Sequence, residues 1–156
     1  MARLLWPIPL LAAVLVPLPG CATEPARSRP AKRGLTVRFF AAGHGDAVLL
    51  RTARGHNVLV DAGRGSRWLL GDNLVQRRIV PHLRRAGVRR LHAFVITHPH
   101  VDHFGDAPRL ASAVAIQRVY LNPDGALRYR GILAGLAPKL RFVTLHRGRS
   151  LQFGRL

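Results

Sequence analysis

The chain has 156 residues, 48% of them hydrophobic, and its 25 Lys and Arg residues against 7 Asp and Glu give a formal net charge of +18. This length suits one domain rather than two, and the hydrophobic content excludes a disordered chain. A surface this basic attracts polyanions such as nucleic acid or anionic lipid headgroups. The basic residues are scattered rather than gathered in one run, so the charge also fits a compositional bias toward Arg, Ala, Leu, Gly and Pro.

The first 20 residues have the pattern of an export signal. Arg3 precedes an apolar, proline-interrupted stretch from Leu4 to Leu18 that is too short for a comfortable membrane-spanning helix. It ends in Leu18-Pro19-Gly20-Cys21, which resembles a bacterial lipoprotein signal with lipid attached to the single Cys. We expect residues 1–20 to be a lipoprotein-type signal peptide, 21–34 a tether and 35–156 the folded domain. The protein would then be exported and anchored in the cell envelope, at the periplasmic face or outer membrane; an ordinary secretory signal is the alternative.

Three strands are predicted at the start of the folded part. Leu35–Ala41 is β-branched and aromatic and reads as a buried strand, and Ala47–Thr52 and Asn57–Val60 follow it. The two glycines of Gly43-His44-Gly45-Asp46 indicate a turn. Short connections between successive strands predict an antiparallel meander.

Helices and strands alternate further along. A helix is predicted next, because apolar residues recur at helical spacing: Leu74, Val75, Ile79, Val80 and Leu83. Asp72 or Asn73 can cap this helix, Pro81 kinks or breaks it, and Gly87 ends it. The expected elements after it are a strand at Leu91–Thr97, a helix at Ala107–Ala113, a strand at Ile116–Leu121, a helix at Ala126–Leu136, a strand at Leu140–Thr144 and a last strand beginning near Ser150. This order predicts an α/β sandwich with mixed sheets and helices packed outside.

Three of the 8 His residues fall within the segment Thr97-His98-Pro99-His100-Val101-Asp102-His103. Pro99 keeps His98 out of the helical region, and side chains two apart on extended backbone point the same way, so His98 and His100 can reach one metal ion. Asp102 and His103 open the next helix and diverge, which lets them serve a second ion. Imidazole nitrogen with carboxylate oxygen suits Zn²⁺, and Mn²⁺ or Fe would also be accepted.

The H-x-H-x-D-H segment after a buried strand, followed by Phe104-Gly105, resembles the signature of the metallo-β-lactamase superfamily. Upstream, the segments from Val37 to Ala47 and from Leu59 to Gly63 are similar to the start of the C-terminal domain of ComEC-type DNA-internalisation competence proteins. Two positions depart from that pattern: His44 stands where Gln is usual, and Asp106 where a second Gly is usual.

The resemblance implies an αββα sandwich, of which this chain holds the N-terminal portion. It also implies two zinc ions, the first bound by His98 and His100 and the second by Asp102 and His103, with hydrolysis by a metal-bound hydroxide. Asp102 would in addition orient the nucleophilic water. Asp61 would lie beside the ligands as their support, and Asp46 would brace the same pocket. Turn capping is the alternative role for both Asp46 and Asp61.

The remaining ligands of such a site would follow downstream, where only His146 is found, in a segment that reads as a turn without a metal role. We therefore expect a truncated domain whose activity on its own is in doubt. The main hypothesis is a hydrolase of phosphodiester or other anionic substrates. The alternatives are an ester, lactone or β-lactam hydrolase of the same fold, and a non-catalytic basic lipoprotein that binds DNA or envelope polyanions. The sequence specifies neither the substrate nor the oligomeric state.

Overall fold

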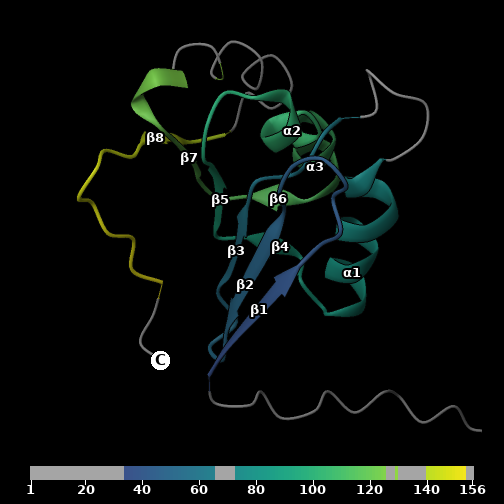
Figure 1. Cartoon of the computed structure of the whole chain (residues 1–156). Helices are drawn as coiled ribbons and strands as arrows, with labels where there is room; N and C mark the ends of the chain where they lie inside the picture. The colour runs from purple at the N-terminus through teal and green to yellow at the C-terminus, as the bar shows by residue number, and fades with distance from the viewer. Residues whose placement is uncertain (1–33, 66–72, 126–128, 130–139, 154–156) are drawn as a thin grey trace, which may run out of the picture.

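The computed structural model describes residues 34–65, 73–125, 129 and 140–153 (Figure 1). The predicted signal peptide and nearly all of the tether lie outside these residues, as does the helix expected at 126–136 apart from Tyr129. The strands are β1 (Leu35–Phe39), β2 (Val48–Thr52), β3 (Asn57–Val60), β4 (Arg90–Leu91), β5 (Ala93–Ile96), β6 (Ala115–Ile116), β7 (Val119–Leu121) and β8 (Phe142–Thr144). The helices are η1 (Val75–Ile79), α1 (Val80–Arg85), α2 (Val101–Phe104), α3 (Ala107–Ala113) and η2 (Pro123–Gly125).

A mixed six-stranded sheet with the order β1-β2-β3-β5-β7-β8 forms the centre of the fold. The first three strands pair antiparallel, as the predicted meander requires, whereas β3, β5, β7 and β8 pair parallel. A two-stranded parallel sheet, β4 with β6, lies beside it. Because β3, β5, β7 and β8 are parallel, their carboxyl ends lie at the same end of the sheet, and the His/Asp segment begins there.

Two strands predicted as single segments are divided in the structure. The stretch expected from Leu91 to Thr97 forms β4 and β5, and the stretch expected from Ile116 to Leu121 belongs to β6 and β7. In both cases the chain pairs first in the small sheet and then crosses into the large one. Hydropathy cannot reveal which sheet each part joins, because an apolar side chain suits either sheet.

The helix predicted after Asn73 is present, and it continues through Pro81 without a break. Residues 75–79 form a π-helical turn that leads directly into α1, which has Pro81 in its first turn. The Asn73 side chain accepts a hydrogen bond from the Gln76 N–H at 3.1 Å, which makes Asn73 a cap. Gly87, at φ 69°, ends the helix in the left-handed conformation.

Helices cover one face of the large sheet. Figure 1 shows α1 on one side of the strands and the C-terminal segment, in yellow, on the other. The main core lies under the helices, where Leu49, Leu59, Phe94 and Leu121 pack against residues such as Leu83. The opposite face carries a smaller cluster of Val58, Ala93 and Tyr120, partly covered by Leu145, Leu151 and Phe153.

The prediction that the first strand is buried was wrong. All five residues of β1 are exposed, because β1 is an edge strand and no helix of the described residues lies over it. Phe39 is 76% exposed, and the register places it in one row with Val48, Val60, Val95 and Val143 on the face away from the helices. The strand expected from Ser150 was also wrong over residues 150–153, which form no strand. Within the described residues, no helix is long and apolar enough to cross a membrane.

Candidate metal centre

The His/Asp segment connects the carboxyl end of β5 to α2. Pro99 interrupts helical backbone, and His100 is extended at φ −97° and ψ 143°, so α2 begins only at Val101. His98 and His100 therefore lie on the loop, as predicted, and Asp102 and His103 lie on the first turn of the helix. This corner places two loop imidazoles beside a carboxylate and an imidazole from a helix.

Three imidazole rings converge at this corner. The ring centroids of His98 and His103 lie 3.8 Å apart, and those of His98 and His100 lie 4.8 Å apart. Asp102 Oδ2 lies 3.6 Å from His103 Nε2. The structure thus brings together the four residues that the sequence predicted as metal ligands.

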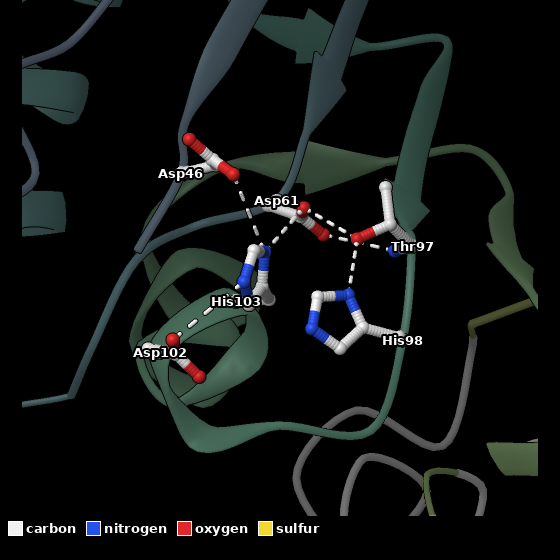
Figure 2. A network of polar contacts seen from close by, with 6 residues as sticks. All are labelled: Asp46, Asp61, Thr97, His98, Asp102 and His103. Carbon is white, nitrogen blue, oxygen red and sulfur yellow. Dashed lines mark hydrogen bonds and ion pairs between the residues drawn. The ribbon is translucent and has the colours of Figure 1, made fainter. Parts of the chain in front are cut away.

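Asp61 is buried beneath this cluster and organises it (Figure 2). It follows β3, it is 1% exposed, and it has the left-handed φ of 55° that Asp tolerates better than most residues. Its Oδ1 accepts a hydrogen bond from the Thr97 N–H at 2.9 Å, and its Oδ2 accepts one from the Thr97 hydroxyl at 2.7 Å. His103 Nδ1 lies 2.8 Å from the same Oδ2. A buried carboxylate needs such partners, because an unpaired one would be costly to desolvate.

These contacts set the tautomers of two imidazoles. Asp61 is an acceptor, so His103 Nδ1 carries a proton and donates it to Asp61 Oδ2. The single proton of the Thr97 hydroxyl goes to Asp61, so the contact of 2.9 Å between Thr97 Oγ1 and His98 Nδ1 requires the proton on His98 Nδ1. The Nε2 atoms of both rings take no part in these contacts, which is the arrangement of histidines in carboxylate–histidine–metal triads.

Thr97 is the site residue that the sequence reasoning missed. It was treated only as the last residue of a strand, although it links Asp61 to His98 through both its backbone and its hydroxyl. The signal available was its position directly before the first His of the motif. Because Asp61 is 36 residues earlier in the chain, only the pairing of β3 with β5 reveals the partner.

Asp46 approaches the cluster from the loop between β1 and β2. Its Oδ2 lies 3.8 Å from His103 Nδ1, and its side chain is 71% exposed. Asp46, Asp61 and His103 offer ligand atoms that all lie within 4.8 Å of one another, which is a second grouping able to hold an ion. In that grouping both Asp61 oxygens are already hydrogen-bonded and His103 would present its protonated Nδ1. The set predicted from the sequence would instead use the Nε2 atoms of His98 and His103.

Close backbone contacts hold the three loops of the site together. A Cβ atom on Gly45, whose φ is 105°, would lie 1.8 Å from the Asp102 carbonyl oxygen, so only glycine permits this approach. The Ala62 N–H donates to the His103 carbonyl at 2.8 Å, and the Gly63 N–H donates to the Asp46 carbonyl at 2.9 Å. The predicted Gly-rich turn is thus part of the scaffold of the site.

Asp106 has a structural role. It is fully buried, its Oδ2 accepts a hydrogen bond from the Val75 N–H at 3.2 Å, and its Oδ1 accepts one from Arg109 at 2.7 Å. It therefore ties the start of the π-helical turn to α3. Gly105 remains necessary where it is, because an added Cβ would come within 2.4 Å of the Gly65 nitrogen.

The other histidines of the described residues lie outside this cluster. His44 is exposed in its loop, and His146 is exposed before the turn at Gly148 that the sequence predicted. His82 packs edge-to-face on Phe40, with ring centroids 5.6 Å apart. Burial, together with Arg38 and other nearby arginines, lowers the pKa of His82.

Comparison with known proteins agrees with this geometry. The family model described as the metallo-beta-lactamase superfamily matches residues 41–143, more than half of the chain. The chain belongs to the metallo-beta-lactamase superfamily. The matched range contains every residue of the cluster, from Asp46 to His103.

Two relatives refine the assignment. The chain is 42% identical over 69 residues to the competence protein ComA of Neisseria gonorrhoeae, a match that covers 44% of this chain and 9% of that protein. It also resembles a solved metallo-beta-lactamase from Cronobacter sakazakii, a HARLDQ motif mutant, with a TM-score of 0.53 and 22% identity over 76% of this chain and 47% of that one. The second likeness shows the fold alone. Both the predicted fold class and the resemblance to competence proteins are confirmed, and the chain spans less than half the length of either relative.

Proposed function

We propose that this chain is the metal-binding part of a metal-dependent hydrolase, related to ComEC-type competence proteins, that acts on phosphodiester or other anionic substrates. The observation that carries the proposal is the close approach of the His98 and His103 rings, each held through its Nδ1 atom by Thr97 or Asp61, next to His100 and Asp102.

The donor set fits zinc. His98 and His100 would hold one ion and Asp102 with His103 a second, while Mn²⁺ or Fe would be accepted by the same nitrogen and oxygen atoms. Metal ions bound there would supply Lewis acidity and a water ionised near neutral pH. Asp61 and Thr97 hold the imidazoles in place, and Asp102 orients the attacking water through its accessible carboxylate.

Charge favours an anionic substrate. The chain has 25 basic residues against 7 acidic ones, so its field would concentrate phosphodiesters near the surface. The similarity to a protein named as a competence protein supports the proposed relation to competence proteins. Hydrolysis of an ester, lactone or β-lactam remains the alternative that substrate tests must separate.

Metal content is the first test. We expect zinc in the purified chain by elemental analysis and its loss in a His98→Ala/His100→Ala double variant, whereas His146→Ala, which removes an exposed imidazole from a turn, should keep it. Equal metal in all three proteins would overturn the assignment of these ligands.

Substrate class is tested with chromogenic compounds. The proposal is supported if the chain hydrolyses a chromogenic phosphodiester when metal is present, and if this activity is lost after chelation and in the double variant. Turnover of a chromogenic β-lactam alone would select the alternative function. DNA binding that falls steeply with salt, persists with chelator and is accompanied by no turnover would indicate the non-catalytic lipoprotein.

Export and anchoring are also proposed, on the pattern that ends in Leu18-Pro19-Gly20-Cys21. In a bacterial host, radiolabelled palmitate should enter the chain and should not enter a Cys21→Ser variant. Secretion of an unlabelled, processed chain would favour the ordinary signal peptide instead.

A further inference from the structure

Acidic side chains are confined to one end of the parallel strands among the described residues. The described acidic residues all lie at the carboxyl end or in the loops beside it, where the metal centre is: Asp46, Asp61, Asp102, Asp106 and Asp124. The opposite edge, where β3, β5, β7 and β8 begin, has no acidic residue within the described part of the chain. That edge carries Arg54, His56, Arg90, His92, Arg118 and Arg141, which we call the amino-end rim.

Backbone hydrogen bonds place these residues in a row. The His92 N–H donates to the Asn57 carbonyl at 2.8 Å, the Phe94 N–H to the Arg118 carbonyl at 2.9 Å, and the Val119 N–H to the Arg141 carbonyl at 2.8 Å. Neighbouring strands are about 4.8 Å apart, so the row from β3 to β8 spans roughly 14 Å. The four arginines of the rim are exposed, and no carboxylate of the described residues pairs with them.

A cavity of about 280 Å³ opens in this row. Its polar lining comes from His56, His92, Gln117, Arg118 and Gln152, and its apolar lining from Tyr120 and Phe153, whose rings meet edge-to-face at 6.4 Å. None of these lining side chains is a carboxylate. The cavity therefore presents amide, imidazole and guanidinium donors, which suit the oxygens of a phosphate group.

His92 is held as a donor toward such a group. Its Nδ1 accepts a hydrogen bond from the Asn57 N–H at 3.1 Å, so the proton of the neutral ring is on Nε2. Burial, then His56 and Arg90, lower its pKa, which keeps the ring neutral. An imidazole protonated on Nε2 cannot bind a metal through that atom, so the His56–His92 pair, with ring centroids 4.9 Å apart, is not a second metal centre.

We propose that the amino-end rim binds the phosphate backbone of a nucleic-acid strand, at a site separate from the metal centre. A row of roughly 14 Å can contact about three successive phosphates. A concave site with converging donors fits discrete phosphate groups better than a flat lipid surface does, and none of the six rim residues is a large apolar side chain that could insert into a bilayer. The site is independent of the proposed hydrolysis, because it lies at the opposite end of the sheet.

The test is fluorescence anisotropy of a labelled 20-nucleotide oligothymidylate with the full chain at 50–200 mM salt. Three phosphate contacts predict a slope of log K against log salt near −2, and Arg90→Gln/Arg118→Gln should bring it toward about −0.7 and weaken binding at least tenfold. Arg147→Gln/Arg149→Gln removes the same charge from exposed residues after β8, and binding should stay within about twofold. Equal losses in the two variants would show a response to net charge alone and would overturn the proposal.

Two further arms identify the source of the phosphate and separate this proposal from the hydrolase. Inorganic phosphate, compared with chloride at equal ionic strength, should not displace the oligonucleotide at low millimolar concentration; efficient displacement would mean that the site takes free phosphate. Binding to anionic phosphatidylserine vesicles is measured with the same variants. If vesicle binding requires the rim arginines and oligonucleotide binding does not, the rim is a membrane-binding surface. The His98→Ala/His100→Ala variant should bind the oligonucleotide as the parent does, whether or not the parent hydrolyses anything. Matching thermal unfolding of the rim variant and the parent excludes misfolding as the cause.

Discussion

Replacing Asp61 by Asn should separate the organisation of the metal centre from the stability of the fold. Asn tolerates the left-handed φ of 55° as well as Asp does, so the backbone need not move. Of the three contacts that Asp61 accepts, the one from the Thr97 N–H at 2.9 Å can persist on the amide oxygen. The amide NH₂ then takes the place of the oxygen that faces the Thr97 hydroxyl and His103 Nδ1 at 2.7 and 2.8 Å.

The substitution forces His103 to change its tautomer. Facing an NH₂ group, Nδ1 must become the acceptor, and the proton moves to Nε2, the atom that would bind the metal. Exchanging a charge-assisted hydrogen bond for a neutral one costs about 1–2 kcal/mol of folding free energy. Loss of the orienting carboxylate should lower metal affinity by about 10- to 100-fold, or roughly 1.4–2.7 kcal/mol.

The assay is Zn²⁺ affinity by competition with a chromogenic chelator, with urea unfolding of the same proteins. Asp124→Asn is the matched control, because it removes the same charge from an exposed position after β7. Affinity of Asp61→Asn within about twofold of the parent would refute the tautomer argument, as would an equal loss in the control. The absorption spectrum of bound Co²⁺ should be unchanged in Asp61→Asn; a changed spectrum would make Asp61 itself a ligand.

Three other changes test the fold around the site. In thermal or urea unfolding, Gly45→Ala should destabilise the chain by several kcal/mol, because its Cβ would meet the Asp102 carbonyl. Gly43→Ala, whose Cβ would have nothing within 4 Å, should cost only the roughly 1–2 kcal/mol of its positive φ. Equal effects of the two variants would contradict the packing described. Because the pKa of His82 is lowered in the folded chain, the unfolded chain binds this proton at a higher pH, and His82 contributes stability above pH 6.5 that is lost as the pH falls. In His82→Gln, the urea midpoint should therefore fall less on acidification. An unchanged fall would mean that other groups cause it. Phe39→Thr should leave the unfolding free energy within about 0.5 kcal/mol of that of the parent, since Phe39 is 76% exposed. It should also reduce self-association measured by light scattering. A large loss of stability would mean that the outer face of β1 is covered in solution.

Local pattern was enough for most elements. The third strand and the helix at Ala107–Ala113 have the boundaries expected, and the capping Asn73 and the end at Gly87 were each readable from a single residue type. These features depend on backbone preferences within a few residues of the chain. Long-range pairing is different: the division of β4 from β5, and of β6 from β7, depends on which sheet each part joins, and nothing within the segment records that choice.

The sequence by itself determined the candidate ligand set, because His98, His100, Asp102 and His103 lie within six positions and the proline between the first two restricts the backbone of His98. Only the tertiary structure decided how the imidazole rings of this set are held. The parallel pairing of β3 with β5 carries Asp61 to Thr97 across 36 residues, and this contact places the protons on the two Nδ1 atoms. The tertiary structure also decided the burial of the strands. Alternation along a strand marks two faces, but whether a face is covered depends on elements elsewhere in the chain, and so the exposure of Phe39 could not be read from its neighbours.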